Sequence, residues 1–197
     1  MKRDGPKNIV ASVQARLVER SRELGVEHQL TLARFGGERL LYRLSKSEFA
    51  DRFILKGAAL LLLWLGEPIR PTKDVDLLGF GDTSAEALKR VFIELCTIES
   101  PDDGLTFLTD SVQVEAIRED QEYGGMRVKL MAMLGNVRIP LQVDVGAGDA
   151  VVPPRRNSWT IPASSICRAL AFVPIGRRPR LPRRLRPWCG SRWQTAD

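Results

Sequence analysis

The sequence predicts a mixed α/β fold in which helices cover one side of a mixed sheet. Three observations support this prediction. Apolar residues recur at helical spacing within residues 1–50, short apolar runs with strand-like alternation follow them, and the patterned part ends in a hairpin around Gly135-Asn136. With 197 residues, of which 44% are hydrophobic and 27% charged, the chain is long enough for one compact α/β unit and additional segments.

Residues 1–50 are expected to form an N-terminal helical segment. Ile9, Val13 and Leu17 follow a four-residue step among polar neighbours, and the apolar residues of 32–44 continue in helical style. Gly25 interrupts the pattern and favours a break in the helix. The sequence therefore predicts two amphipathic helices that are separated near this glycine.

Residues 51–153 are expected to form the α/β core, which begins with a strand, a helix and a second strand. The apolar run Phe53-Ile54-Leu55 predicts a short strand that ends at Lys56-Gly57. The apolar residues from Ala58 to Trp64 predict a buried helix. Those from Val75 to Phe80 predict the second strand, which follows the turn residues of the connecting segment.

A further helix and three strands complete the predicted core. Thr83, with Glu86 three residues later, predicts a capping box at the start of the helix, whose inner face is apolar. The alternation from Val112 to Ala116 predicts the next strand. Gly135-Asn136 suits a two-residue turn between the two strands that follow.

The two-residue turn also predicts the register of the hairpin. The residues that then face each other are Leu134 and Val137, Lys129 and Gln142, and Arg127 and Asp144. Because side chains alternate along a strand, one face of the last strand collects its apolar residues, namely Ile139, Leu141, Val143 and Val145. Asp144 is expected on the opposite, polar face together with Gln142 and Arg127.

Three aspartates are expected to gather on this polar face. Asp74 and Asp76 stand two residues apart in a strand and so project from the same side, and Asp144 lies on a neighbouring strand. Carboxylates this close repel one another unless a cation lies between them, and hard oxygen ligands suit Mg²⁺ that is completed by substrate phosphates. We predict that all three are catalytic metal ligands, which with a second ion could align an attacking hydroxyl and a leaving pyrophosphate. The alternative is a solvated acidic pair.

A phosphate site is predicted beside these acids. Lys56-Gly57-Ala58 lies between a strand and a helix, where free backbone N–H groups and the helix dipole favour an anion, and Gly57 allows the backbone to approach closely. Arg70, four residues before Asp74, is a further candidate contact for a triphosphate. The alternatives are an ordinary turn at Lys56-Gly57 and, for Arg70, a surface salt bridge worth at most about 1 kcal/mol.

Residues 154–197 are expected to form a tail that differs in kind from the rest of the chain. Residues 151–197 contain ten arginines, no lysine and one acid, so their net charge is +9. Because the whole chain has a net charge of +6, the first 150 residues carry −3. They also hold seven of the twelve prolines. One interpretation is a basic arm that binds RNA or lipid phosphates, with tryptophans that stack on bases. The interpretation that we favour is a frameshifted, disordered segment.

No part of the sequence is expected to enter a membrane. The longest apolar run, Phe53 to Leu65, is interrupted by Lys56 and is too short to cross a bilayer. Residues 1–6 are not followed by the apolar stretch of a signal peptide. We therefore expect a cytoplasmic protein without a membrane partner.

Three ordered stretches resemble a known family: residues 53–60 (FILKGAAL), 70–77 (RPTKDVDL) and 139–149 (IPLQVDVGAGD). The family is that of the AbiEii/AbiGii nucleotidyltransferase toxins, which includes the mycobacterial MenT toxins, and the resemblance covers residues 8–153. It implies a DNA polymerase β-like nucleotidyltransferase core and a toxin of a type IV-like toxin–antitoxin or abortive-infection system. It also implies Mg²⁺-dependent transfer of a nucleotide from an NTP to an RNA, tRNA 3′ ends included, and a cognate antitoxin encoded nearby.

By this resemblance, Gly57 and Ala58 form the phosphate-binding pair, and Asp74 and Asp76 form the metal pair. Ala58 is a departure, because the family usually has a second glycine or a serine there. A larger departure follows Pro154, where the family continues into a helical part with a catalytic lysine that is missing or replaced in this chain. The alternatives are therefore an active transferase and a form that is inactive because it lacks that cation.

Two other functions stay open. A metal-dependent glycosyltransferase also uses an Asp-x-Asp pair, with a nucleotide sugar, but the Lys-Gly element that precedes the acids at polymerase-like spacing argues against it. A non-catalytic module would bind RNA through the basic tail. Its binding would weaken steeply with salt and would be lost when residues 155–197 are deleted.

Overall fold

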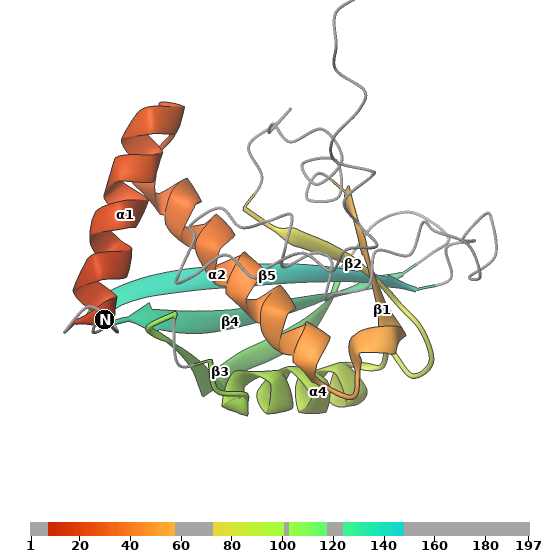
Figure 1. Cartoon of the computed structure of the whole chain (residues 1–197). Coiled ribbons are helices and arrows are strands. Elements are labelled where there is room, and N and C mark those ends of the chain that lie inside the picture. The colour runs from red at the N-terminus through yellow and green to blue at the C-terminus, as the bar shows by residue number, and fades with distance from the viewer. Residues whose placement is uncertain (1–7, 58–72, 101–102, 118–123, 148–197) are drawn as a thin grey trace, which may run out of the picture.

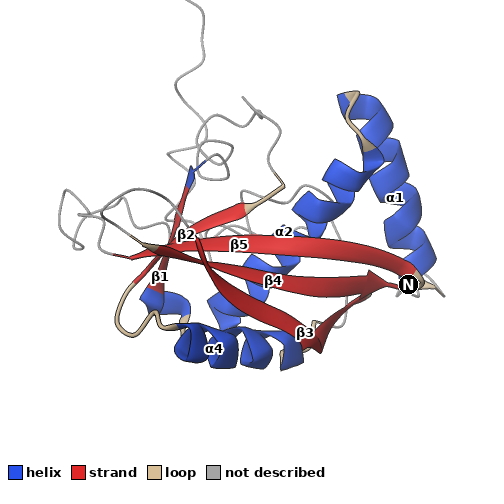
Figure 2. Cartoon of the chain, turned by 180° about the vertical axis from the view of Figure 1, so that it is seen from behind, coloured by secondary structure: helices blue, strands red, loops and turns tan. Residues whose placement is uncertain are grey.

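The computed structural model describes residues 8–57, 73–100, 103–117 and 124–147, and these residues form a layer of helices and a five-stranded sheet. The elements follow in the order α1 (Ile9–Leu24), α2 (His28–Lys46), the 3-10 turn η1 (Ala50–Arg52), β1 (Phe53–Lys56), β2 (Val75–Gly79), α4 (Ala85–Thr97), β3 (Leu105–Ile117), β4 (Gly125–Leu134) and β5 (Val137–Ala147). In Figure 1, α2 crosses in front of the sheet, and in the reverse view of Figure 2 it passes behind it. The predicted mixed α/β fold is confirmed. None of the described helices is long and apolar enough to cross a membrane.

The two N-terminal helices form as the sequence predicts. The side chain of Asn8 accepts a hydrogen bond from the backbone N–H of Ala11 and so caps α1. Gly25 ends this helix in the left-handed conformation, with φ 61°. Val13 and Leu17 are fully buried in the same core as the sheet. The predicted break near Gly25 is therefore confirmed.

Two adjacent glycines allow α2 to lie close to the sheet. A Cβ atom added at Gly36 would lie 2.9 Å from a methyl carbon of Leu141, and one added at Gly37 would lie 3.0 Å from a methyl carbon of Val75. Larger residues at these positions would therefore push the helix away from β5 and β2. The pair explains how one helix covers both strands that bear the predicted acids.

The start of α4 differs from the prediction. Ser84, not Thr83, is the N-cap, and its hydroxyl accepts a hydrogen bond from the N–H of Ala87 at 3.3 Å. Asp82 accepts a hydrogen bond from the N–H of Ser84, which lowers the pKa of the Asp82 carboxyl. The predicted capping box of Thr83 and Glu86 is wrong, because the helix begins one residue later and the hydroxyl at its N-cap is that of Ser84. The predicted inner face of the helix is confirmed, since it buries Leu88, Val91, Phe92 and Leu95.

The sheet has the strand order β1-β2-β5-β4-β3. The pair of β2 with β5 is parallel, and the other three pairs are antiparallel. The predicted hairpin register is confirmed residue by residue, with Leu134 opposite Val137 and Arg127 opposite Asp144. β3 is longer than predicted and changes register between Leu108 and Gln113. The predicted helix from Ala58 to Trp64 and the tail lie outside the described residues.

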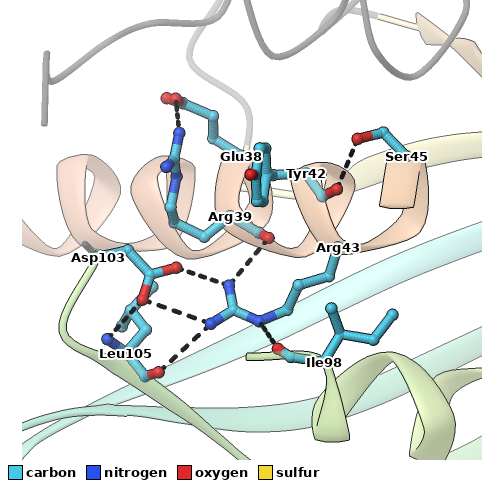
Figure 3. Close-up of polar contacts among 8 residues, drawn as sticks. All are labelled: Glu38, Arg39, Tyr42, Arg43, Ser45, Ile98, Asp103 and Leu105. Carbon is cyan, nitrogen blue, oxygen red and sulfur yellow. Dashed lines mark hydrogen bonds and ion pairs between the residues drawn. The ribbon is translucent and has the colours of Figure 1, made fainter. Parts of the chain in front are cut away.

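A buried ion pair ties α2 to the other elements of the core. Arg43 of α2 donates a hydrogen bond to Asp103 at 2.7 Å, and their side chains are 2% and 0% exposed (Figure 3). The same guanidinium donates to the carbonyl oxygen of Ile98, at the end of α4, and lies over the ring of Phe107 in β3. One arginine therefore fixes where α2, α4 and β3 meet.

Removal of one partner of this pair should destabilise the fold. Asp103→Asn leaves the guanidinium of Arg43 without its counter-charge, and a broken buried pair typically costs about 3–5 kcal/mol. Urea denaturation should show a loss of this order. The matched control is Glu23→Gln, which breaks an exposed pair with Arg20 and should change the free energy of unfolding by less than about 1 kcal/mol. Equal effects of the two substitutions would contradict the assigned role of Arg43.

Candidate active site

A row of charged residues crosses all five strands on the face that points away from α2 and α4. Each member lies directly opposite the next on the neighbouring strand, from β1 through β2, β5 and β4 to β3. Residues that face each other across strands share one face of a sheet. This charged row consists of Lys56, Asp76, Asp144, Arg127 and Glu115.

The opposite face of the same strands explains why the charged row points outward. The residues on either side of Asp76 are Val75 and Leu77, and those on either side of Asp144 are Val143 and Val145. All four are buried in the core. Because strand side chains alternate, burial of these neighbours directs both aspartates to the polar face.

Asp144 is held by two neighbouring side chains. Arg127 donates two hydrogen bonds to it, from Nε at 2.9 Å and from Nη2 at 2.8 Å, which is the two-point geometry of a strong arginine–carboxylate pair. The side-chain amide of Gln142 lies 3.3 and 3.4 Å from the two carboxylate oxygens. The hydrogen bonds that Arg127 donates to Asp144 raise the pKa of Arg127 above its already high ordinary value. The orientation of Asp144 is therefore fixed from β4 and from its own strand.

Asp74 directly precedes β2 and belongs to the same electrostatic cluster. Partial burial raises the pKa of its carboxyl, and the negative charge of Asp144 raises it further. Arg127 and Lys73 act in the opposite direction. Asp74 and Asp144 are thus close enough to repel each other, as expected of carboxylates that share one site.

Gly57 packs directly against Asp76. Its φ of +69° lies in the left-handed region, and a Cβ atom there would lie 2.0 Å from a carboxylate oxygen of Asp76 and 2.8 Å from the carboxyl carbon. An alanine at this position would therefore displace the carboxylate as well as strain the backbone. The end of β1 and the aspartate of β2 form one contiguous surface.

The structure brings most of the predicted site residues together. Lys56, Asp76 and Asp144 lie opposite one another across β1, β2 and β5, while Gly57 follows the end of β1 and Asp74 directly precedes β2. The other two predicted nucleotide-binding residues, Ala58 and Arg70, lie outside the described residues. Within the described part of the chain, no three acidic, histidine or cysteine side chains converge closely enough to form a complete metal cage.

Sequence reasoning did not assign a role to Arg127, Gln142 or Glu115. The hairpin register placed the first two beside Asp144, and that register was the available signal. The extension of the charged row to Glu115 depends on how β3 pairs with β4 beyond its irregularity, for which the sequence has no local signal.

Paired carboxylates beside a basic strand end are the arrangement expected of enzymes that transfer phosphoryl or nucleotidyl groups. Comparison with protein families agrees with this class. The sequence model of the family described as nucleotidyl transferase AbiEii toxin, type IV TA system, matches residues 39–173, which is more than half of the chain. The chain belongs to this nucleotidyltransferase family. None of the curated proteins matches it.

This membership confirms the predicted resemblance and the predicted class of enzyme. It implies a polymerase β-like nucleotidyltransferase fold, the use of an NTP and a place in a type IV toxin–antitoxin system. The match differs in extent from the expected residues 8–153, since it begins within α2 and enters the arginine-rich tail. The boundaries of residues 1–50, 51–153 and 154–197 stay predictions.

Replacement of Asp74 should change stability in a pH-dependent way. Folding raises the pKa of this carboxyl, which means that its anionic form is less favourable in the folded chain than in the unfolded chain. At pH values above the folded pKa, the ionised carboxylate therefore lowers the free energy of unfolding. Asp74→Asn should therefore raise the free energy of unfolding at pH 7, and the gain should shrink as the pH falls toward about 4. Denaturation at several pH values measures this, with Asp51→Asn, at an exposed position of η1, as the control. A loss of stability at pH 7 would refute the assigned repulsion.

Proposed function

We propose that this protein transfers a nucleotide from an NTP to the 3′ end of an RNA, as a toxin whose activity a cognate antitoxin restrains. The observation that supports this most is the position of Asp76. It lies opposite Asp144 in the parallel pair of β2 and β5 and in contact with Gly57 at the end of β1. One aspartate thus joins the predicted phosphate site to the predicted third acid.

Asp74, Asp76 and Asp144 would hold Mg²⁺ in this proposal. Carboxylate oxygens are the ligands that Mg²⁺ prefers, and it is commonly bound by one or two carboxylates together with waters and substrate phosphates, so a complete protein cage is not required. The repulsion between Asp74 and Asp144, which a cation would relieve, supports the fit. When bound, Mg²⁺ would neutralise the charge that develops on the phosphates.

The chain's own residues would bind and orient the two substrates. Lys56 and the backbone at Gly57 would bind the triphosphate, to which Ala58 and Arg70 would add contacts. The 3′ oxygen of the RNA would form a bond to the α-phosphorus as the bond from that phosphorus to pyrophosphate breaks. Asp144, oriented by Arg127, would ligate the metal or accept the proton of the attacking hydroxyl. A tRNA 3′ end is a suitable acceptor under this proposal.

Substitution of Asp76 tests the proposal. Asp76→Ala should lower nucleotide transfer by at least about 100-fold, because groups that stabilise transition-state charge typically contribute about 10² to 10³ in rate. The measurement is incorporation of each labelled NTP into total RNA and into tRNA, with Mg²⁺ present and after its removal by a chelator. Asp51→Asn should leave transfer unchanged. Transfer that survives Asp76→Ala, or that needs no divalent cation, would refute the site.

A further inference from the structure

A cavity of about 530 Å³ opens beside the candidate active site. It begins at Lys73 and Asp74 and extends over β5 and β4 to β3, where Gln113 lines its far side. Its volume is within the range of about 300–1,000 Å³ that is usual for ligand sites. Among the described residues of the predicted phosphate and metal sites, Asp74 alone lines this cavity.

The aspartates separate this cavity from the phosphate site. In the strand order β1-β2-β5-β4-β3, Lys56 and Gly57 lie on the β1 side of Asp76, whereas the cavity lies on the side of β5, β4 and β3. In an in-line transfer, the attacking group approaches from the side opposite to the leaving pyrophosphate. If the triphosphate binds at Gly57, the cavity therefore remains available for the acceptor.

The lining of the cavity suits a nucleobase. Three glutamines contribute side-chain amides, each of which can both donate and accept hydrogen bonds: Gln29, Gln113 and Gln142. Met131 and Pro140 supply apolar surface between them. Unpaired RNA bases are recognised in this way, by contacts to their flat faces and hydrogen bonds to their edges.

The charges of the lining suit an attached phosphate backbone. Two lysines, Lys73 and Lys129, line the cavity, and Asp74 is its one acidic residue within the described part of the chain. Lys129 also pairs with Glu115 just outside the cavity. Lysines near a base site bind the flanking phosphates of a strand.

One lining residue connects the cavity to the reacting groups. The amide of Gln142 lies within hydrogen-bond distance of both oxygens of Asp144. A nucleoside held by Gln142 would therefore place its sugar hydroxyls near Asp144. We propose that this cavity binds the 3′-terminal nucleoside of the acceptor RNA; this inference rests on the proposed function and adds to it the place of the acceptor.

The test measures how tightly a short RNA binds, independently of transfer. The probe is a single-stranded RNA hexamer with a fluorophore at its 5′ end and a 3′-deoxy terminus that cannot react. A second hexamer lacks only the 3′-terminal base. Fluorescence anisotropy gives the affinity of both for the full chain, for Gln113→Leu and for the control Thr106→Leu, an exposed polar-to-apolar change elsewhere on β3.

The wild-type chain should bind the intact hexamer about tenfold more tightly than the hexamer without the terminal base. Gln113→Leu should abolish most of this difference, and Thr106→Leu should preserve it. Equal affinity of the wild type for the two hexamers would overturn the inference, and so would an undiminished difference in Gln113→Leu. A loss of NTP affinity in Gln113→Leu, measured without RNA, would instead assign the cavity to the NTP base. If the protein transfers no nucleotide but the wild type still prefers the intact hexamer, the proposed function is refuted while the binding of the terminal nucleoside in the cavity is not.

Discussion

The parallel pairing of β2 with β5 is the constraint on which the rest of the site depends. It places Asp76 opposite Asp144, while the antiparallel partners on either side add Lys56 and Arg127 to the same row. A slip of one residue would turn both aspartates toward the core and expose their apolar neighbours, so burial of those neighbours enforces the register. The close approach of α2 at Gly36 and Gly37 packs the helix against the apolar side chains of Leu141 and Val75 in these two strands.

This arrangement concentrates negative charge, and the protein compensates for it only in part. Arg127 neutralises Asp144 through two hydrogen bonds, yet the pKa of Asp74 remains raised by burial and by Asp144. A cluster optimised for stability alone would not retain such repulsion. The residual charge, the contact of Gly57 with Asp76 and the cavity beyond Asp74 together fit a site that binds a cation and two anionic substrates on opposite sides.

Local signals predicted the local parts of the fold. The turn at Gly135-Asn136 and the strand alternation sufficed for the register of Arg127 with Asp144, because both depend on adjacent strands. The ion pair of Arg43 with Asp103 joins residues that are 60 positions apart, and the parallel pair of β2 and β5 joins segments separated by two other strands, so neither had a signal in the sequence pattern. For the acids, strand alternation predicted that Asp74, Asp76 and Asp144 share one polar face, and the family resemblance implied the metal pair, but the position of Asp144 directly opposite Asp76 follows from the parallel register alone.

The most direct test of the central claim is a titration of the protein with Mn²⁺, which takes the same oxygen ligands as Mg²⁺ and is detected by electron paramagnetic resonance. Performed with a non-hydrolysable NTP analogue present, the titration should show Mn²⁺ bound by the wild-type chain beyond what the analogue alone binds. In Asp76→Asn/Asp144→Asn that additional binding should disappear while the thermal unfolding transition persists. Unchanged Mn²⁺ binding by the double variant would contradict the assignment of the metal to the paired strands β2 and β5.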